Sequence, residues 1–171
     1  MPETVRTLIQ ICLFKAKPQD LGASVNLLIV AIAATLGLFI ARNARLLEDD
    51  VLLISLVQAA LPGLGLKLLL TLFSKSERWL QSATALYGCS ALLLLIIIPF
   101  ILMSDGGALS QGNFSLTQIP IIASSLWYFM VIIFIFRETL EISRVLAFFI
   151  ALVLELSFAT ILLKLFGDQL L

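Results

Sequence analysis

Five long apolar runs constrain this chain more than any other feature of its sequence. They cover about residues 24–41, 51–73, 80–103, 119–136 and 145–166, and each is long enough to cross roughly 30 Å of hydrocarbon as a helix. A helix satisfies all of its backbone hydrogen bonds internally, which is a condition for crossing a bilayer. The sequence therefore predicts an all-α membrane protein with five transmembrane helices.

The composition agrees with this class of protein. Hydrophobic residues make up 61% of the 171 residues and charged residues only 13%, far from the balance of soluble domains. The connections between the runs are too short for a separate soluble domain. We therefore expect residues 1–171 to form a single helical membrane domain whose main environment is the lipid bilayer.

The first 20 residues predict a short helix in the cytoplasmic interface. Apolar side chains recur at steps of three and four residues, which gives one apolar face: Val5, Leu8, Ile9, Cys12 and Ala16. An ordinary solvated segment is the alternative. Pro18 ends this segment, because proline does not continue a helix.

The distribution of basic residues in the short loops predicts the orientation. With a cytoplasmic N-terminus, seven basic residues lie inside, namely Arg6, Lys15, Lys17, Lys75, Arg78, Arg137 and Arg144. Only Arg42 and Arg45 then lie outside, together with the acidic Glu48, Asp49, Asp50, Asp105 and Asp168. The positive-inside rule favours this arrangement, which places the C-terminus outside. The composition suits a bacterial inner (cytoplasmic) membrane. A glycosylation sequon begins at Asn113 in the outer loop, but short sequons occur by chance.

Several classes of function are disfavoured by what the sequence lacks. It has no histidine, which removes the commonest general base and metal ligand, and its eleven basic and eleven acidic residues balance. We therefore expect no catalytic site, no metal, no cofactor and no nucleic-acid partner. Ser124 and Ser125 lack the context of a serine nucleophile, and Cys12 and Cys89 are expected to be small apolar residues.

Two ionisable residues, Lys67 and Glu155, fall well inside the predicted spans. Counting about 1.5 Å per residue from Lys75 and Arg144 places them roughly 12 Å and 16 Å from the cytoplasmic boundary. Each costs about 2.5 to 3.5 kcal/mol at the centre of a span on insertion scales. Their similar depth predicts an intramembrane ion pair between them.

Rows of small residues predict where the spans pack closely. They recur at four-residue steps on the first, second and fifth spans: Ala33 with Gly37, Ala59 with Gly63, and Ala147 with Ala151 and Ala159. Lys67 and Glu155 continue two of these rows, so both charges are expected to face protein. Such a pair would either lock two helices together or serve transport or a proton relay. Alternatively the two residues are unpaired, with Glu155 neutral or with both in contact with another subunit.

The second span contains the helix-disrupting residues Pro62, Gly63 and Gly65. Proline removes a backbone hydrogen bond, so a kink is expected here. Broken helices near the middle of the membrane mark substrate sites in many transporters. A plain proline kink is the commoner case.

Residues 76–99, SERWLQSATALYGCSALLLLIIIP, resemble the stretch that joins the second and third spans of small Yip1-type membrane proteins. The matching residues are Trp79, Gln81, Tyr87 with Gly88, and Pro99, although the usual Gly-Tyr order is reversed. The resemblance implies a non-catalytic five-span protein, linked in eukaryotes to vesicle trafficking and small-GTPase binding. The short loops of this chain put GTPase binding in doubt.

The sequence thus favours a non-catalytic membrane scaffold, assembly factor or accessory subunit that acts through helix–helix contacts with another membrane protein or with itself. The alternative is a small transporter or channel subunit with a midplane site at Lys67 and Glu155.

Overall fold

The computed structural model describes residues 3–46, 50–103 and 118–170. Its α-helices are α1 (Glu3–Cys12), α2 (Val25–Leu46), α3 (Val51–Leu72), α4 (Trp79–Met103), α5 (Gln118–Leu140) and α6 (Arg144–Leu170). Two short 3-10 helices, η1 (Pro18–Asp20) and η2 (Ser76–Arg78), lie in the connections. The sequon and the acidic Glu48, Asp49 and Asp105 lie outside the described residues, as does the side chain of Asp168.

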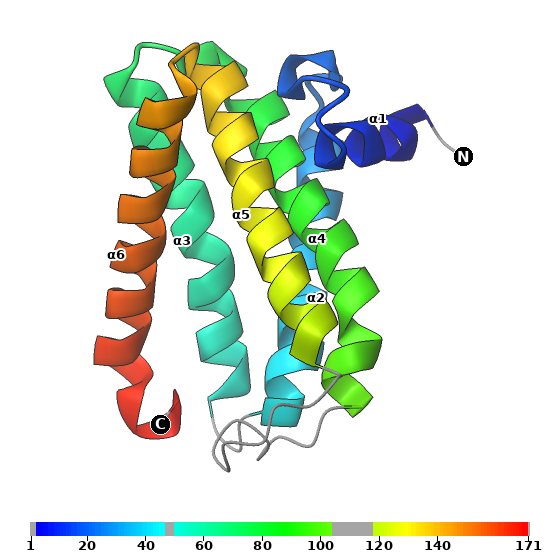
Figure 1. The fold of residues 1–171 in the computed structure, drawn as a ribbon, viewed down its shortest axis with the longest axis vertical. Coiled ribbons are helices and arrows are strands. Elements are labelled where there is room, and N and C mark those ends of the chain that lie inside the picture. The colour runs from blue at the N-terminus through cyan, green and yellow to red at the C-terminus, as the bar shows by residue number, and fades with distance from the viewer. Residues whose placement is uncertain (1–2, 47–49, 104–117, 171) are drawn as a thin grey trace.

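The prediction of five transmembrane helices is confirmed. Helices α2 to α6 are each long and apolar enough to cross a bilayer, and they run alternately down and up in Figure 1. The chain is therefore an all-α, multi-pass membrane protein. The last two helices are longer than the predicted spans and end at Leu140 and Leu170. Pro62 and Pro99 lie inside continuous helices.

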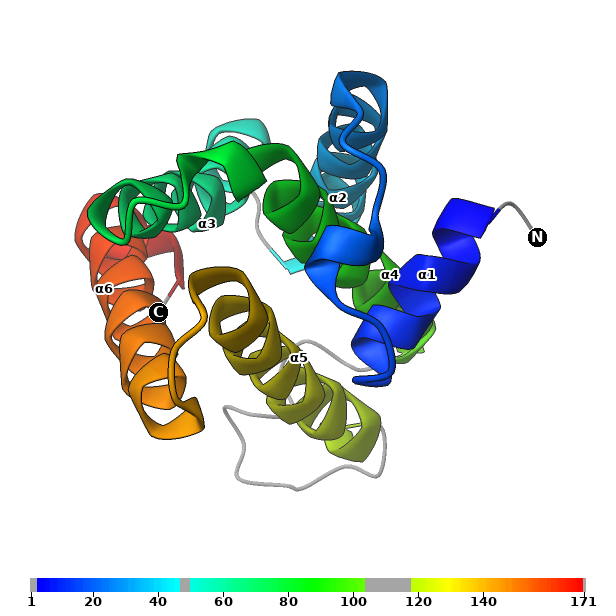
Figure 2. The same ribbon diagram turned by 90° about the horizontal axis from the view of Figure 1, so that it is seen from above.

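The five long helices form a ring. Seen from above, the order around the ring is α2, α4, α5, α6 and α3, and each of these helices contacts the next (Figure 2). Few residues of the α2 and α6 spans are buried within the bundle, 17% and 11% respectively, and a bilayer would cover the residues that stay exposed. The ring encloses the site described below.

Helix α1 lies outside the ring against α4, beside the upper part of the bundle and across the direction of the long helices in Figure 1. Leu8 and Cys12 of its predicted apolar face are buried. Ile11, which lies outside that predicted face, is fully buried as well. The indole N–H of Trp127 on α5 donates a 3.0 Å hydrogen bond to the carbonyl of Cys12, so α1 is attached to two of the long helices.

Ion pairs connect the loops on the upper side of the bundle. Glu141, just after α5, lies 2.6 Å from both Lys75 and Arg78, which precede α4. These two cations lower the pKa of the Glu141 carboxyl to about 2. Glu138 pairs with Lys17 at 3.2 Å and with its neighbour Arg137 at 3.5 Å. The upper loops are therefore held together by side chains from three connections.

Candidate intramembrane binding site

Lys67 and Glu155 do not form the ion pair that the sequence predicts. Lys67 is exposed on the surface of α3, whereas Glu155 on α6 is half-buried and faces into the ring. None of the ion pairs in the described part of the chain contains either residue. The two residues lie at a similar depth along the bundle, but their side chains point in different directions.

The direction of Lys67 follows from the geometry of α3. The buried face of this helix includes Gly63, Leu66 and Leu70, which recur at steps of three and four residues. Lys67 follows Leu66, so its side chain leaves the helix about 100° away from that of Leu66. It emerges at the edge of the packed face, on the surface that lipid would contact.

The small residues of the predicted rows differ in their surroundings. A side chain at Gly63 would collide with the Tyr87 hydroxyl of α4, and one at Gly65 would come within 2.8 Å of the Phe158 ring of α6. Ala59, Ala147 and Ala151 are buried, whereas Ala159 is exposed. On α2, however, Ala33 and Gly37 are exposed, and nothing lies within 4 Å of a side chain built at Gly37. Ala59, Gly63 and Gly65 of α3 thus serve close packing within the chain, whereas Ala33 and Gly37 of α2 do not.

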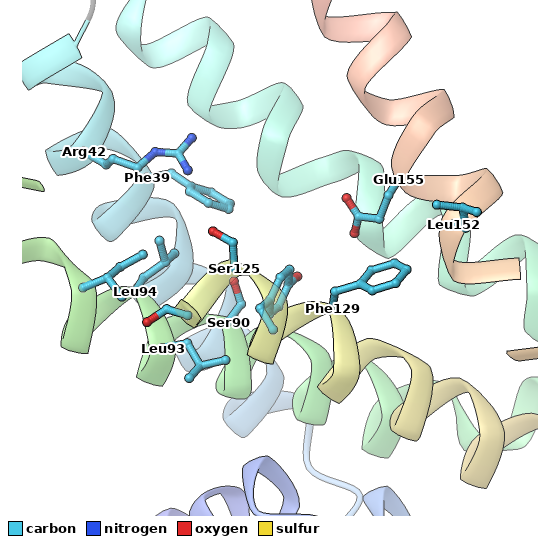
Figure 3. A pocket seen from close by; sticks show the side chains of 12 residues that line it. Phe39, Arg42, Ser90, Leu93, Leu94, Ser125, Phe129, Leu152 and Glu155 are labelled. Carbon is cyan, nitrogen blue, oxygen red and sulfur yellow. The ribbon is translucent and has the colours of Figure 1, made fainter. Parts of the chain in front are cut away.

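A cavity of about 440 Å³ lies within the ring, and we call it the inner cavity. Its lining comes from α2, α4, α5 and α6: Phe39, Arg42, Ser90, Leu93, Leu94, Ile97, Ser124, Ser125, Tyr128, Phe129, Leu152 and Glu155. Figure 3 shows Arg42 and Glu155 on opposite sides of this cavity, with Ser125 between them. The walls are thus mainly apolar, with one acidic group, one basic group and several hydroxyls.

Arg42 is held in place by α3 and by its own helix. Its Nη2 atom donates a 2.9 Å hydrogen bond to the side-chain oxygen of Gln58, and its guanidinium lies 5.2 Å from the ring centre of Phe39. Nε and Nη2 also donate to the side-chain oxygen of Asn43, at 3.3 and 3.2 Å. Asn43 in turn donates to Gln58 and Ser55. This network fixes the guanidinium but supplies only neutral oxygens.

Both charged groups of the inner cavity lack a charged partner within the described residues. No carboxylate lies within ion-pair distance of Arg42 there, and no cation within that distance of Glu155. Counted from the first residues of their helices, Glu155 lies about 16 Å and Arg42 about 25 Å below the upper end of the bundle. The cavity therefore holds two opposite charges at different depths, within the part of the fold that a membrane surrounds.

Only one of these two charges stands out in the sequence. Glu155 interrupts a long apolar run, whereas Arg42 falls at the predicted outer end of its span. The signal that could have found Arg42 is the pattern Arg42, Asn43 and Gln58, in which polar side chains from two adjacent spans lie at one level. No group of three or more His, Cys, Asp or Glu residues converges in the described ranges.

Comparisons of the chain with known family models, with characterised proteins and with solved structures find no match. The resemblance of residues 76–99 to Yip1-type proteins therefore stays a prediction.

Proposed function

We propose that this protein binds a small charged molecule in the inner cavity, as a small transporter or an intramembrane binding protein would. The observation that carries the proposal is that Arg42 and Glu155 line the same cavity without an ion-pair partner among the described residues. Charged residues inside a membrane are costly and usually mark a binding site or pathway. Mainly apolar walls with a few polar groups, and a volume of a few hundred Å³, are also typical of ligand sites.

The charge distribution supports an orientation for this site. Lys17, Lys75, Arg78 and Arg137 lie on the upper side of the bundle, where the ends of α3 and α5 meet the loops (Figure 1). The positive-inside rule supports a cytoplasmic position for this side and for the N-terminus, and the composition supports an inner membrane. Arg42 then lies in the outer half of the bilayer, and the cavity extends from the middle of the membrane towards the outside.

The proposal is tested by what the purified protein retains. The chain and its Glu155→Gln and Arg42→Gln variants would be purified in a mild detergent and weighed intact with any non-covalently bound molecule. We expect the unmodified protein to carry a bound molecule and each variant to carry about tenfold less, because each loses a charge-assisted hydrogen bond. Lys67→Gln is the matched control. It also removes a charge from within a span, but Lys67 does not line the inner cavity.

A third variant separates loss of binding from misfolding. Ser124→Leu adds bulk to the cavity wall but leaves the hydrogen-bond network of Arg42 intact. It should release the bound molecule while its folded yield stays equal to that of Lys67→Gln. A protein that retains nothing, or that retains the same molecule in all variants, would rule out binding in the inner cavity.

A membrane scaffold or accessory subunit is the second candidate, and the exposed row of Ala33 and Gly37 favours it. Small residues let helices approach closely, and this row lines an apolar groove of about 700 Å³ between α1, α2 and α4. A scaffold should co-purify with a stoichiometric protein partner that Gly37→Leu releases. Ala159→Leu, also exposed but on α6, is the control and should keep the partner.

A further inference from the structure

Resting on the proposed function, we infer that the inner cavity binds the headgroup of a zwitterionic phospholipid that carries a primary amine, with the ammonium group at Glu155 and the phosphate at Arg42. The inference depends on four observations: the two signs of charge, the free donors of Arg42, the hydroxyls that line the cavity, and an apolar groove beside the cavity.

The two signs of charge call for a ligand with both. A purely cationic ligand would leave Arg42 unpaired, and a purely anionic ligand would leave Glu155 unpaired. Leaving a buried charge without a partner costs more than the pair contributes when it is formed. A zwitterion satisfies both side chains, and the different depths of Arg42 and Glu155 require its charged groups to lie at different levels along the bundle.

Arg42 has donors left for an anionic group. Its hydrogen bonds to Asn43 and Gln58 use Nε and Nη2, and Nη1 makes none with the described residues. A guanidinium has five N–H donors in a planar fork that fits phosphate and carboxylate oxygens. Because the network with α3 already fixes its position, Arg42 can receive an anion without first being ordered.

The environment of Glu155 favours a primary amine. An ammonium group has three donors, and a carboxylate with the hydroxyls of Ser125 and Tyr128 lining the same cavity offers oxygen acceptors for them. A choline group has no N–H donor and would leave these acceptors unused. The aromatic rings of Tyr128 and Phe129 could still attract a quaternary ammonium, so choline lipid is the informative competitor.

A neighbouring groove favours a lipid over a soluble zwitterion. The α4–α5 groove has a volume of about 550 Å³ and is lined by Leu92, Leu95, Ile96, Ala123 and Trp127, with residues of α1 at one end. Leu93 and Ser124 line both this groove and the inner cavity. An amphipathic molecule can therefore place its headgroup inside the ring and an acyl chain along the groove, which a soluble amino acid would leave empty.

The experiment is a competition for the purified protein in detergent, followed by the mass of the intact complex. Phosphatidylethanolamine is mixed with phosphatidylcholine and phosphatidylglycerol of the same acyl chains, and glycerophosphoethanolamine serves as the headgroup without chains. We expect retention of phosphatidylethanolamine over the other two lipids by about tenfold, from the charge-assisted hydrogen bonds of its amine and phosphate. Glycerophosphoethanolamine should be retained far more weakly.

The variants assign the two ends of the lipid. Glu155→Gln should reduce the preference for phosphatidylethanolamine over phosphatidylglycerol to near parity. Arg42→Gln should weaken the binding of all three lipids. Ser124→Phe, at the junction of the inner cavity and the α4–α5 groove, should weaken binding of phosphatidylethanolamine. Lys67→Gln should bind the lipids as the unmodified protein does. Glu155 and Arg42 would thus have separable effects, which a general loss of folding would not produce.

Three outcomes would overturn the inference: equal retention of the choline lipid, a preference that survives Glu155→Gln, or glycerophosphoethanolamine held as tightly as the lipid. If the protein instead retains a different molecule that both Glu155→Gln and Arg42→Gln release, the lipid inference fails and the proposed function stands. If it retains nothing, both fail.

Discussion

The hydroxyl of Tyr87 on α4 donates a 2.7 Å hydrogen bond to the backbone carbonyl of Ala59 on α3. Gly63 lies one helical turn beyond Ala59, and a side chain at Gly63 would collide with the same hydroxyl. The absent side chain of Gly63 is therefore what allows the tyrosine to reach across. Tyr87 also accepts at its backbone carbonyl a 2.8 Å hydrogen bond from Thr35 of α2, so three helices meet at this residue.

We predict that Gly63→Ala lowers the free energy of unfolding by about 1 to 3 kcal/mol, because its methyl group displaces the Tyr87 hydroxyl from a buried hydrogen bond. In a Tyr87→Phe background the same change should cost clearly less, since the colliding oxygen is gone. The measurement is reversible unfolding in mixed micelles of a mild detergent and dodecyl sulfate, for both single variants and the double variant.

Gly37→Ala provides the control for this cycle. It is also a helical glycine in a transmembrane helix, but its surroundings are open. We expect it to be neutral or to stabilise by up to about 1 kcal/mol, as alanine is the better helix former. Equal costs at Gly37 and Gly63 would contradict the close contact with Tyr87.

A second prediction concerns Ser74, which follows α3 and has a left-handed backbone with φ 56°. Its side chain is exposed, so the strain of this conformation is not offset by buried contacts. Ser74→Gly should therefore raise the free energy of unfolding by roughly 0.5 to 1 kcal/mol. Ser76→Gly, two residues on in η2, should give no gain, because the backbone there is helical and glycine only adds freedom to the unfolded chain.

The third prediction is a pH dependence that arises from Glu141. Its pKa is about 2 in the folded protein and 4.5 in its reference state. A lowered folded-state pKa means that its ion pairs with Lys75 and Arg78 stabilise the protein above about pH 4.5 and that this stabilisation is lost as the pH falls towards 2. Melting temperatures of the unmodified protein and Glu141→Gln should differ near neutral pH and converge in acid.

The difference in melting temperature between the unmodified protein and Glu141→Gln should be small and should shrink in high salt, because Glu141, Lys75 and Arg78 are in contact with solvent. Glu77→Gln is the control, since Glu77 lies on the same side of the bundle without an ion pair in the described part of the chain. A Glu141→Gln protein with an unchanged acid profile would show that the pairs contribute nothing measurable.

The spans could be predicted because hydrocarbon thickness and backbone hydrogen bonding leave a long apolar run few alternatives. The close packing at Gly63 followed from its size alone, since a residue without a side chain permits approach whichever helix comes near. Gly65 was expected only to weaken the helix, and its close approach to Phe158 was not predicted. The order of helices around the ring could not be predicted in this way. Lipid and protein are equally apolar surroundings, so the apolar residues of α2 and α6 do not reveal which of their faces is packed.

The error about Lys67 has the same origin. Depth along a helix follows from counting residues, but the direction of a side chain around the helix depends on which neighbours pack against it. In the row of Ala59, Gly63 and Lys67, the first two residues lie on the packed face as predicted. Each four-residue step turns slightly more than one full turn of the helix, so after two steps Lys67 lies at the edge of that face. Arg42 was missed because residues at a span's end are normally explained by the water–lipid boundary.

The final prediction follows from the separation of Lys67 and Glu155. Because they form no ion pair, the stability effects of Lys67→Gln and Glu155→Gln should add, with a coupling within about 0.5 kcal/mol in a double-mutant cycle. Lys67→Leu should stabilise the protein, since it removes an exposed charge from the lipid-facing surface of α3. Unfolding in mixed micelles measures both effects. A coupling well above 1 kcal/mol would place the two residues in contact in the membrane, and Glu155 would then be neutralised by Lys67 and would no longer need a charged ligand.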